Sequence, residues 1–153
     1  RIDSILITFL MDGNSVSSLQ LLKLNSKDYK PGTASWAWWA IGDFNGDCKV
    51  DLTLRNVKDN RLIIFLMDGH SIASYSVLKS LSNVDYKPSI SSWVWFQSTD
   101  INGDGKSDLI LRNKNDNRLI FLQMNGTTMG SAQVLQLNGA DYKPSPASWA
   151  WWR

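Results

Sequence analysis

Short apolar stretches separated by polar turns run through the whole chain. The stretch from Leu62 to Met67 is continuously apolar, and Leu109 to Leu111 forms a second such run. Stretches of this length, bounded by Asn, Asp, Gly and Pro, are typical of strands. Where the pattern is clearest it predicts four strands, at about residues 93–98, 107–112, 118–124 and 131–137. Asn125 and Gly126 are typical of a tight hairpin turn that leads into the last of them.

The composition favours strands as well. All 14 acidic residues are aspartates, and Ser, Asn, Gly and Trp are plentiful. Asp and Asn prefer turns whereas Glu is a good helix former, so this balance predicts an all-β fold. A chain of 153 residues with 43% hydrophobic content can bury the core of one ordinary domain. We therefore expect residues 1–153 to form a single array without a separate second domain.

One unit of 56–57 residues repeats along the chain. A Met-Asp/Asn-Gly turn, an Asp-Tyr-Lys-Pro segment and a Trp-x-Trp segment mark it, starting at Met11, Met67 and Met124; at Asp28, Asp85 and Asp141; and at Trp36, Trp93 and Trp149. Such a period indicates a propeller or solenoid, and four short antiparallel strands with a crossover describe a propeller blade. The chain holds about 2.6 repeats: a partial unit 1–42 and the units 43–99 and 100–153.

Two loops carry oxygen-bearing side chains at positions one, three, five and nine. These residues are Asp43, Asn45, Asp47 and Asp51 in the first loop and Asp100, Asn102, Asp104 and Asp108 in the second. Ca²⁺ takes six to eight oxygen ligands at about 2.3–2.6 Å, so such a loop must curl, and Gly46 and Gly103 allow the curl. The duplication predicts two structural calcium sites rather than Asx-rich turns without metal.

These motifs resemble the FG-GAP/VCBS repeat family over essentially the whole chain. The resemblance rests on Trp-x-Trp, the loop that follows Gly42, the strand from Asp51 to Asn56 and the Met-Asp-Gly turn. It implies β-propeller blades whose first two strands are joined by each calcium loop; integrin α heads and a Psathyrella-type mushroom lectin are related in architecture. It also implies that the carbonyl oxygens of Lys49 and Lys106 bind the metal at position seven.

The chain departs from that family in two respects. The Phe-Gly and Gly-Ala-Pro motifs of the integrin version are missing, which places the resemblance in the VCBS-like branch. Cys48 also stands where the second loop has Gly105. A cysteine with positive φ is strained by about 1–2 kcal/mol, so we expect the first calcium site to be the weaker one.

The aromatic residues allow two interpretations. All eight tryptophans lie in the three Trp-x-Trp segments, where both faces of the strand suit burial between blades. The alternative is a multivalent sugar site, because aromatic faces stack on carbohydrate and the repeated Tyr and Asp residues supply polar partners. The candidate ligand-binding residues are Tyr29, Trp36, Trp38, Tyr86, Trp93, Trp95, Tyr142, Trp149 and Trp151.

No catalytic constellation is predicted. His70 corresponds to Asn14 and Thr127 in the other units, which indicates a solvent-exposed turn residue, and no Ser-His-Asp set or uncommitted carboxylate pair is left. We expect the arginines that flank the strands to pair with Asp59 and Asp116. Asn125 fits the N-glycosylation pattern, although its hairpin position explains the Asn-Gly pair equally well.

Net charge and cysteine content bear on the partners and the cellular location that we expect. A net charge of +2 with scattered basic residues does not predict a nucleic-acid partner, and no apolar run approaches the ~20 residues that cross a bilayer. One cysteine excludes an internal disulfide. Weak calcium loops need the millimolar free Ca²⁺ found outside cells, so we expect an extracellular or cell-surface location.

Propellers close with about four to eight blades, more than this chain supplies. If each repeat is counted from its Trp-x-Trp strand, the chain starts at the third strand of one repeat and ends after the first strand of another. The segment that is missing between Arg153 and Arg1 is therefore a metal loop with the strand that follows it. Two explanations stay open: further repeats in a longer chain, or association of several copies. The functional hypotheses are accordingly an extracellular calcium-stabilised binding or adhesion module, glycan-binding in lectin fashion, or a structural subunit of a surface filament or multi-subunit assembly.

Overall fold

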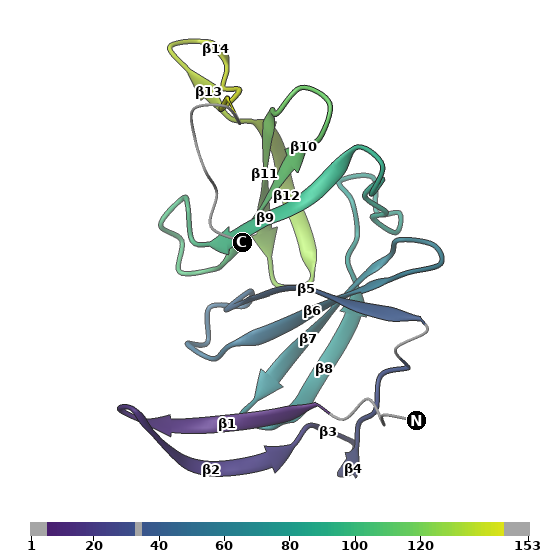
Figure 1. Ribbon diagram of the computed structural model, residues 1–153, viewed down its shortest axis with the longest axis vertical. Coiled ribbons are helices and arrows are strands. Elements are labelled where there is room, and N and C mark those ends of the chain that lie inside the picture. Colours follow the sequence, from purple (N-terminus) through teal and green to yellow (C-terminus); the bar gives the residue numbers. More distant parts are fainter. Residues whose placement is uncertain (1–5, 33–34, 146–153) are drawn as a thin grey trace.

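The computed structural model describes residues 6–32 and 35–145, in which every regular element is a strand (Figure 1). In chain order these strands are β1 (Ile7–Asp12), β2 (Ser15–Leu21), β3 (Lys23–Leu24), β4 (Lys27–Asp28), β5 (Trp36–Gly42), β6 (Asp51–Asn56), β7 (Leu62–Asp68), β8 (Ser71–Val77), β9 (Trp93–Thr99), β10 (Asp108–Asn113), β11 (Leu119–Asn125), β12 (Thr128–Val134), β13 (Gln136–Leu137) and β14 (Ala140–Asp141). The described part of the chain contains no helix, so the all-β prediction is confirmed.

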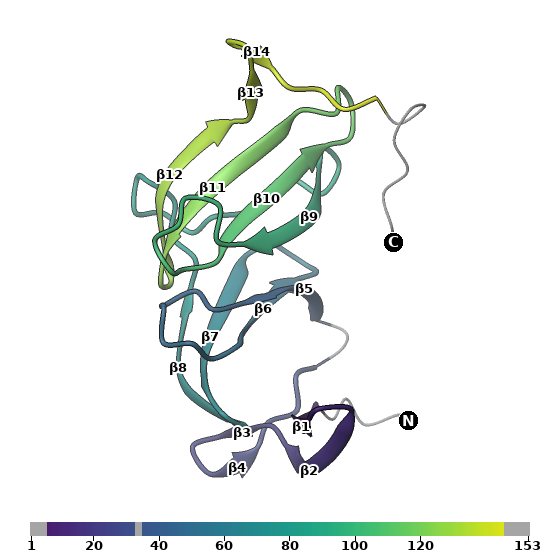
Figure 2. The same ribbon diagram turned by 90° about the vertical axis from the view of Figure 1, so that its left-hand side faces the viewer.

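The strands form sheets that follow one another in chain order. The first is the hairpin β1-β2, the second has the order β4-β3-β8-β7-β6-β5, the third has the order β12-β11-β10-β9, and β13 pairs with β14. Neighbouring strands are antiparallel except for the parallel pair of β3 with β8. The fold includes a curled sheet, and Figures 1 and 2 show the sheets arranged along the long axis of the molecule.

The same hairpin geometry recurs three times. The residues that close the hairpins pair as Asp12 with Ser15, Asp68 with Ser71 and Asn125 with Thr128. Each hairpin then has a bulge in the same place, which leaves one extra residue on its second strand: Ser17, Ala73 or Gly130. The sequence repeat is therefore also a repeat of backbone register.

Three of the four predicted strands lie within a residue of their observed positions, whereas the last one does not. It was expected at 131–137, but β12 covers Thr128–Val134. The two-residue turn at Gly126 and Thr127 makes the chain pair at once, and the bulge accommodates Gly130 inside the strand. The hairpin turn itself is confirmed.

Apolar clusters lie on both faces of the six-stranded sheet. Because successive strand residues point to opposite faces, β7 directs Leu62 and Ile64 to one side and Phe65 and Met67 to the other. One cluster contains Leu22, Leu54, Phe65, Met67 and Ile72. The other contains Trp39, Ala40, Phe44, Leu62, Ile64, Leu78, Leu109, Leu111, Leu122, Met124 and Met129. Burial on both faces explains why β7 is continuously apolar.

Polar side chains fix the turns between the strands. Arg61 Nε lies 2.7 Å from Asp59 Oδ2, and Arg118 Nε lies 2.7 Å from Asp116 Oδ2, so the predicted ion pairs form at these two arginines. The other predicted donors behave differently, since Arg55 Nη1 and Arg112 Nη1 donate at 2.8 Å to the side-chain oxygens of Asn60 and Asn117. Both asparagines have positive φ, a conformation that Asn tolerates.

The Asp-Tyr-Lys-Pro segments return to the preceding strand in every unit. The amides of Tyr29, Tyr86 and Tyr142 donate to the carbonyls of Leu22, Leu78 and Leu135 at 2.7, 2.8 and 2.8 Å. The aspartate of the motif pairs one residue further on, with Lys23, Lys79 and Gln136 in turn. The segment is thus a backbone clasp at the end of each hairpin.

Two kinds of backbone contact join consecutive units. Lys23 pairs in parallel with Ser71, and Lys79 pairs in parallel with Thr128, so the clasp of one unit extends to the second hairpin strand of the next. Gly126 N also donates to Phe44 O at 2.9 Å, which connects the last hairpin to the loop after β5.

Gly42 lies at a close contact between the second and third sheets. A Cβ at this position would lie 2.6 Å from both Cβ and Oγ of Ser107, so Gly42→Ala must push β5 away from the loop before β10. We expect a loss of about 1–3 kcal/mol in the free energy of unfolding, measured by urea denaturation. Gly32→Ala is the matched control, because its Cβ would meet no atom within 4 Å. Equal stability of the two variants would contradict the observed packing.

Candidate metal sites

The first Asp-rich loop lies between β5 and β6 and is anchored at its start. Phe44 is fully buried in the cluster between the second and third sheets. The backbone of Asp43 bonds to Ser107 in both directions: its amide donates to Ser107 Oγ at 3.0 Å, and its carbonyl accepts from the Ser107 amide. Ser98 Oγ donates to the carbonyl of Ile41 just before the loop. The loop therefore sits at a junction between sheets.

The backbone of this loop curls around the side chain of its first residue. Asp43 Oδ1 accepts from the amides of Gly46 and Asp47 at 2.7 and 3.1 Å, and Asp43 Oδ2 accepts from the amide of Cys48 at 2.7 Å. Asp47 N also donates to Asn45 Oδ1 at 3.2 Å, and Lys49 N donates to Asp47 Oδ1 at 3.0 Å. The side chains at positions one, three and five therefore share the inside of one tight turn.

The second loop, between β9 and β10, repeats this network bond for bond. Asp100 Oδ1 accepts from the amides of Gly103 and Asp104 at 2.8 and 3.2 Å, and Asp100 Oδ2 accepts from Gly105 N at 2.9 Å. The bonds to Asn102 Oδ1 and Asp104 Oδ1 also recur, at 3.1 and 2.9 Å. Equivalent residues thus give the same local geometry in two different surroundings.

The aspartate at position nine closes each loop against the adjacent hairpin. Asp51 is fully buried and accepts from Phe44 N at 2.9 Å and from Met67 N at 2.8 Å. Asp108 is equally buried and accepts from the amides of Ile101 and Met124 at 3.2 and 2.8 Å. Asp51 therefore connects the first loop to the end of β7, and Asp108 connects the second loop to the end of β11.

Electrostatics at position nine favour a cation. Burial raises the pKa of Asp51, the amide bonds from Met67 and Phe44 act in the opposite direction, and the carboxylates of Asp47 and Asp43 raise it further. The pKa of Asp108 is raised for the same reasons, with Asp104 and Asp100 as the neighbours. Among the described residues neither buried carboxylate forms an ion pair with Lys or Arg.

The donor set suits an oxygen-preferring cation, although the carboxylates do not converge on one point. Within residues 6–32 and 35–145, no three Asp, Glu, His or Cys side chains form a cluster ready to hold a metal. The two lysines at position seven face the hairpins: Lys49 Nζ lies 3.0 Å from Asp68 Oδ1 and 3.8 Å from Asp47 Oδ2, and Lys106 Nζ donates to Asn125 Oδ1 at 2.8 Å. Lys49 therefore also pairs with Asp47, one of the candidate ligands, whereas Lys106 bonds to the hairpin residue Asn125.

The aromatic candidates pack largely against the apolar clusters. Tyr29 and Trp36 border the first cluster, and Tyr86 and Trp93 border the second, all of them half-buried. The Tyr29 ring lies 5.4 Å from Phe65, and burial raises the pKa of Tyr29 and of Tyr86.

The remaining predicted residues lie elsewhere. Tyr142 is half-buried, and Asn125 is exposed at the end of β11. Trp149 and Trp151 lie outside the described residues, as do the side chains of Trp38 and Trp95. The structure thus places the metal candidates in two loops, and among the aromatic candidates with described side chains, Tyr29 and Trp36 border one apolar cluster whereas Tyr86 and Trp93 border the other.

Sequence comparison between the units missed the two serines that hold the first loop. Ser98 and Ser107 correspond to Ile41 and Val50 in the preceding unit, so they do not belong to the repeated pattern. This difference could have identified the two serines from the sequence. A position that is polar in one unit and apolar in another indicates that the two copies have different surroundings. No family model, curated protein or solved structure gave a significant match to this chain. Within the described residues, no helix is long and apolar enough to span a membrane.

The residue at position six distinguishes the two loops. Cys48 has a φ of 64°, and its counterpart Gly105 has a φ of 80°, so the expectation of a cysteine with positive φ is confirmed. We predict that Cys48→Asn raises the free energy of unfolding by up to about 1 kcal/mol, because Asn tolerates this conformation. Gly105→Cys should lower it by about as much.

Both variants are to be compared by urea denaturation in chelator, so that metal binding does not contribute. No atom lies within 4 Å of a Cβ at Gly105, which makes backbone strain the main difference between the variants. Changes of the same sign in both would contradict this interpretation.

Proposed function

We propose that this chain is a calcium-stabilised β-propeller-type array of the FG-GAP/VCBS kind that acts outside the cell in binding or adhesion. Its partner is a glycan or an extracellular protein, and its calcium ions are structural. No catalytic role is proposed. The proposal rests on the pair of loops in which the same backbone amides donate to the first aspartate, each closed by a buried aspartate that has no basic partner among the described residues.

The propeller assignment is supported by repeated strand order. The strands β5 to β8 and the strands β9 to β12 each form an antiparallel meander, with an Asp-rich loop between the first and second strands. Face-to-face burial between the two meanders, through the cluster that contains Phe44 and Leu122, is also expected of neighbouring blades.

Residues at positions one, three, five, seven and nine would hold the ion. In the first loop these are the side-chain oxygens of Asp43, Asn45, Asp47 and Asp51 and the carbonyl of Lys49; in the second they are those of Asp100, Asn102, Asp104 and Asp108 and the carbonyl of Lys106. Oxygen-only ligands in a flexible loop suit Ca²⁺ better than Zn²⁺. A bound cation would remove the repulsion among the loop carboxylates and connect the strands on either side of the loop.

Calcium should bind at two sites and stabilise the fold. In isothermal titration the chain should bind two Ca²⁺, and Asp104→Ala should bind one, since Asp104 belongs to the second loop alone. Asp12→Ala, outside both loops, is the matched control and should keep two sites. At a calcium concentration of 100 Kd the free energy of unfolding should rise by about 2.7 kcal/mol per site. An unchanged melting temperature with calcium and with chelator would contradict a structural ion.

A glycan partner is tested with a glycan array in calcium buffer. We expect binding that is lost with Tyr142→Ala, because Tyr142 is a half-buried repeat tyrosine and no aromatic ring contact to it is observed among the described residues. Tyr75→Ala is the matched control, since Tyr75 is exposed but stands outside the repeated motif. Loss of signal in both variants, or no signal with the unmodified chain, would leave an extracellular protein as the proposed partner.

A second candidate function is a structural subunit of a surface filament or multi-subunit assembly. It is favoured by large apolar side chains that lie open at both ends of the sheet series, among them Phe9, Met11 and Val16 at one end and Ile101 and Leu135 at the other. Exposed apolar surface of this kind is typical of interaction sites.

A further inference from the structure

One face of the first hairpin is open, although the same face is covered in the two later hairpins. Phe9, Met11 and Val16 are 54%, 57% and 53% exposed. By hairpin register their counterparts are Phe65, Met67 and Ile72 in β7-β8 and Leu122, Met124 and Met129 in β11-β12. None of these six counterparts is more than 8% exposed. In each later case the preceding unit supplies the cover.

The opposite end of the molecule has a matching open face. Leu22 and Leu78, which follow the first two hairpins, are buried by the next unit, whereas their counterpart Leu135 is 40% exposed. Phe44 at position two of the first loop is fully buried, but Ile101 in the second loop is 43% exposed. Ile101 and Leu135 are thus the residues that a following unit would cover.

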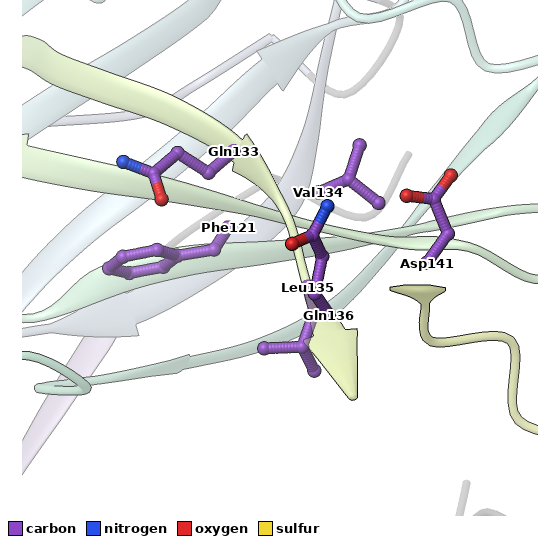
Figure 3. A pocket seen from close by; sticks show the side chains of 6 residues that line it. All are labelled: Phe121, Gln133, Val134, Leu135, Gln136 and Asp141. Atoms are coloured by element: carbon purple, nitrogen blue, oxygen red, sulfur yellow. The ribbon is translucent and has the colours of Figure 1, made fainter. Parts of the chain in front are cut away.

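Beside Leu135 this second face is hollowed. The hollow is lined by side chains of β11 to β14, and Figure 3 shows Phe121 and Gln133 on one side of it and Asp141 on the other, with Leu135 between them. Phe121 corresponds to Ile64, which is fully buried in the cluster between the second and third sheets. The open face therefore has residues equivalent to those of the internal interface, but no described unit packs on it.

Backbone edges are unpaired in the same two places. At each internal junction, one residue beside the clasp pairs in parallel with the first residue of the second hairpin strand of the next unit. These pairs are Lys23 with Ser71 and Lys79 with Thr128. The residue that corresponds to Lys23 and Lys79 in the last unit is Gln136. The residue that corresponds to Ser71 and Thr128 in the first hairpin is Ser15. In the described part of the chain, β13 pairs only with β14, and β2 pairs only with β1. Both edges are available for one more junction of the same kind.

We propose that the open face of the β1-β2 hairpin docks on the open face of the β9–β12 sheet of a second copy of this chain. The junction repeats the internal ones: Phe9 and Met11 cover Leu135 and Phe121, and Gln136 pairs with Ser15. A second copy is the occupant that the residues favour, because the two faces are the two sides of an interface that the chain already forms twice. The inference rests on the second candidate function and on neither calcium nor glycan binding.

The two docking faces are different, so the contact is heterologous. Each added copy presents a new free face, and repetition gives a closed ring or an open filament according to the rotation per copy. Blocking either face should therefore stop growth, and two molecules blocked on opposite faces should still form a pair. An isologous dimer would not behave in this way.

The experiment is sedimentation velocity on the 153-residue chain in calcium buffer, with Phe9→Asp and Leu135→Asp as the variants. The unmodified chain should form species larger than a dimer. Each variant alone should be a monomer, its association weakened at least about 10-fold, since a charge replaces an apolar contact residue at the centre of the interface. A mixture of the two variants should give a one-to-one dimer. Val84→Asp, an exposed apolar residue away from both faces, is the matched control and should assemble normally.

A monomeric unmodified chain would overturn the proposal, as would variants that assemble alone or a mixture that stays monomeric. If either variant fails to fold by circular dichroism, Val16→Lys and Ile101→Lys test the same two faces. The result is independent of the first candidate function. Absence of glycan binding with the predicted assembly would reject only the lectin role, and glycan binding by a persistent monomer would reject only the docking.

Discussion

The structure depends on the burial of both faces of each sheet by its neighbours. A meander of four short strands is too thin to cover its own apolar side chains, so stability comes from stacking one unit on the next. The middle sheet fulfils this condition, with Ile64 packed towards one neighbour and Phe65 towards the other. The β9–β12 sheet fulfils it on one face only, and the β1-β2 hairpin leaves Phe9 exposed on one face and Leu10 exposed on the other. Repeat architecture and apolar ends are therefore two consequences of the same constraint.

Buried carboxylates determine how the strands are joined within a unit. Asp51 and Asp108 receive two backbone amides each, one from their own loop and one from the end of the neighbouring hairpin. A carboxylate can be buried only when its hydrogen-bonding capacity and charge are compensated. The backbone amides satisfy the hydrogen-bonding capacity. The negative charge of the loop is not compensated by them, and it is the physical reason for proposing a cation there.

Local features of the fold followed from the sequence, because they depend on residues close together in the chain. The hairpin turns at Met-Asp-Gly, the positive φ of Cys48 and a strand formed by the apolar run Leu62–Met67 were all predicted, and all were found. The predicted start of β12 was wrong, since the strand begins at Thr128 and contains Gly130 at a bulge, and a bulge is set by pairing with β11.

Features that depend on contacts between units could not be predicted. Phe44 and Ile101 occupy the same position in nearly identical loops, yet one is buried and the other exposed, because only the first has a sheet stacked on it. Likewise, the sequence marks Tyr29 and Tyr86 as aromatic repeats, but their packing against the clusters follows from the stacking. The candidate metal loops were predictable as sequence patterns, whereas their place at the junctions was not.

That placement gives the two loops unequal positions in any assembly. The first loop is already fixed by Ser107 and by the packing of Phe44, so its order does not depend on a further contact. The second loop carries Ile101 on the face proposed to receive another copy. A cation that orders this loop would lower the entropic cost of docking, and docking would equally favour the ordered, cation-binding loop, since linkage between two binding events is reciprocal. Calcium and self-association would thus be coupled through Asp100 to Asp108 and not through Asp43 to Asp51, although the amide bonds to the first aspartate recur in both loops.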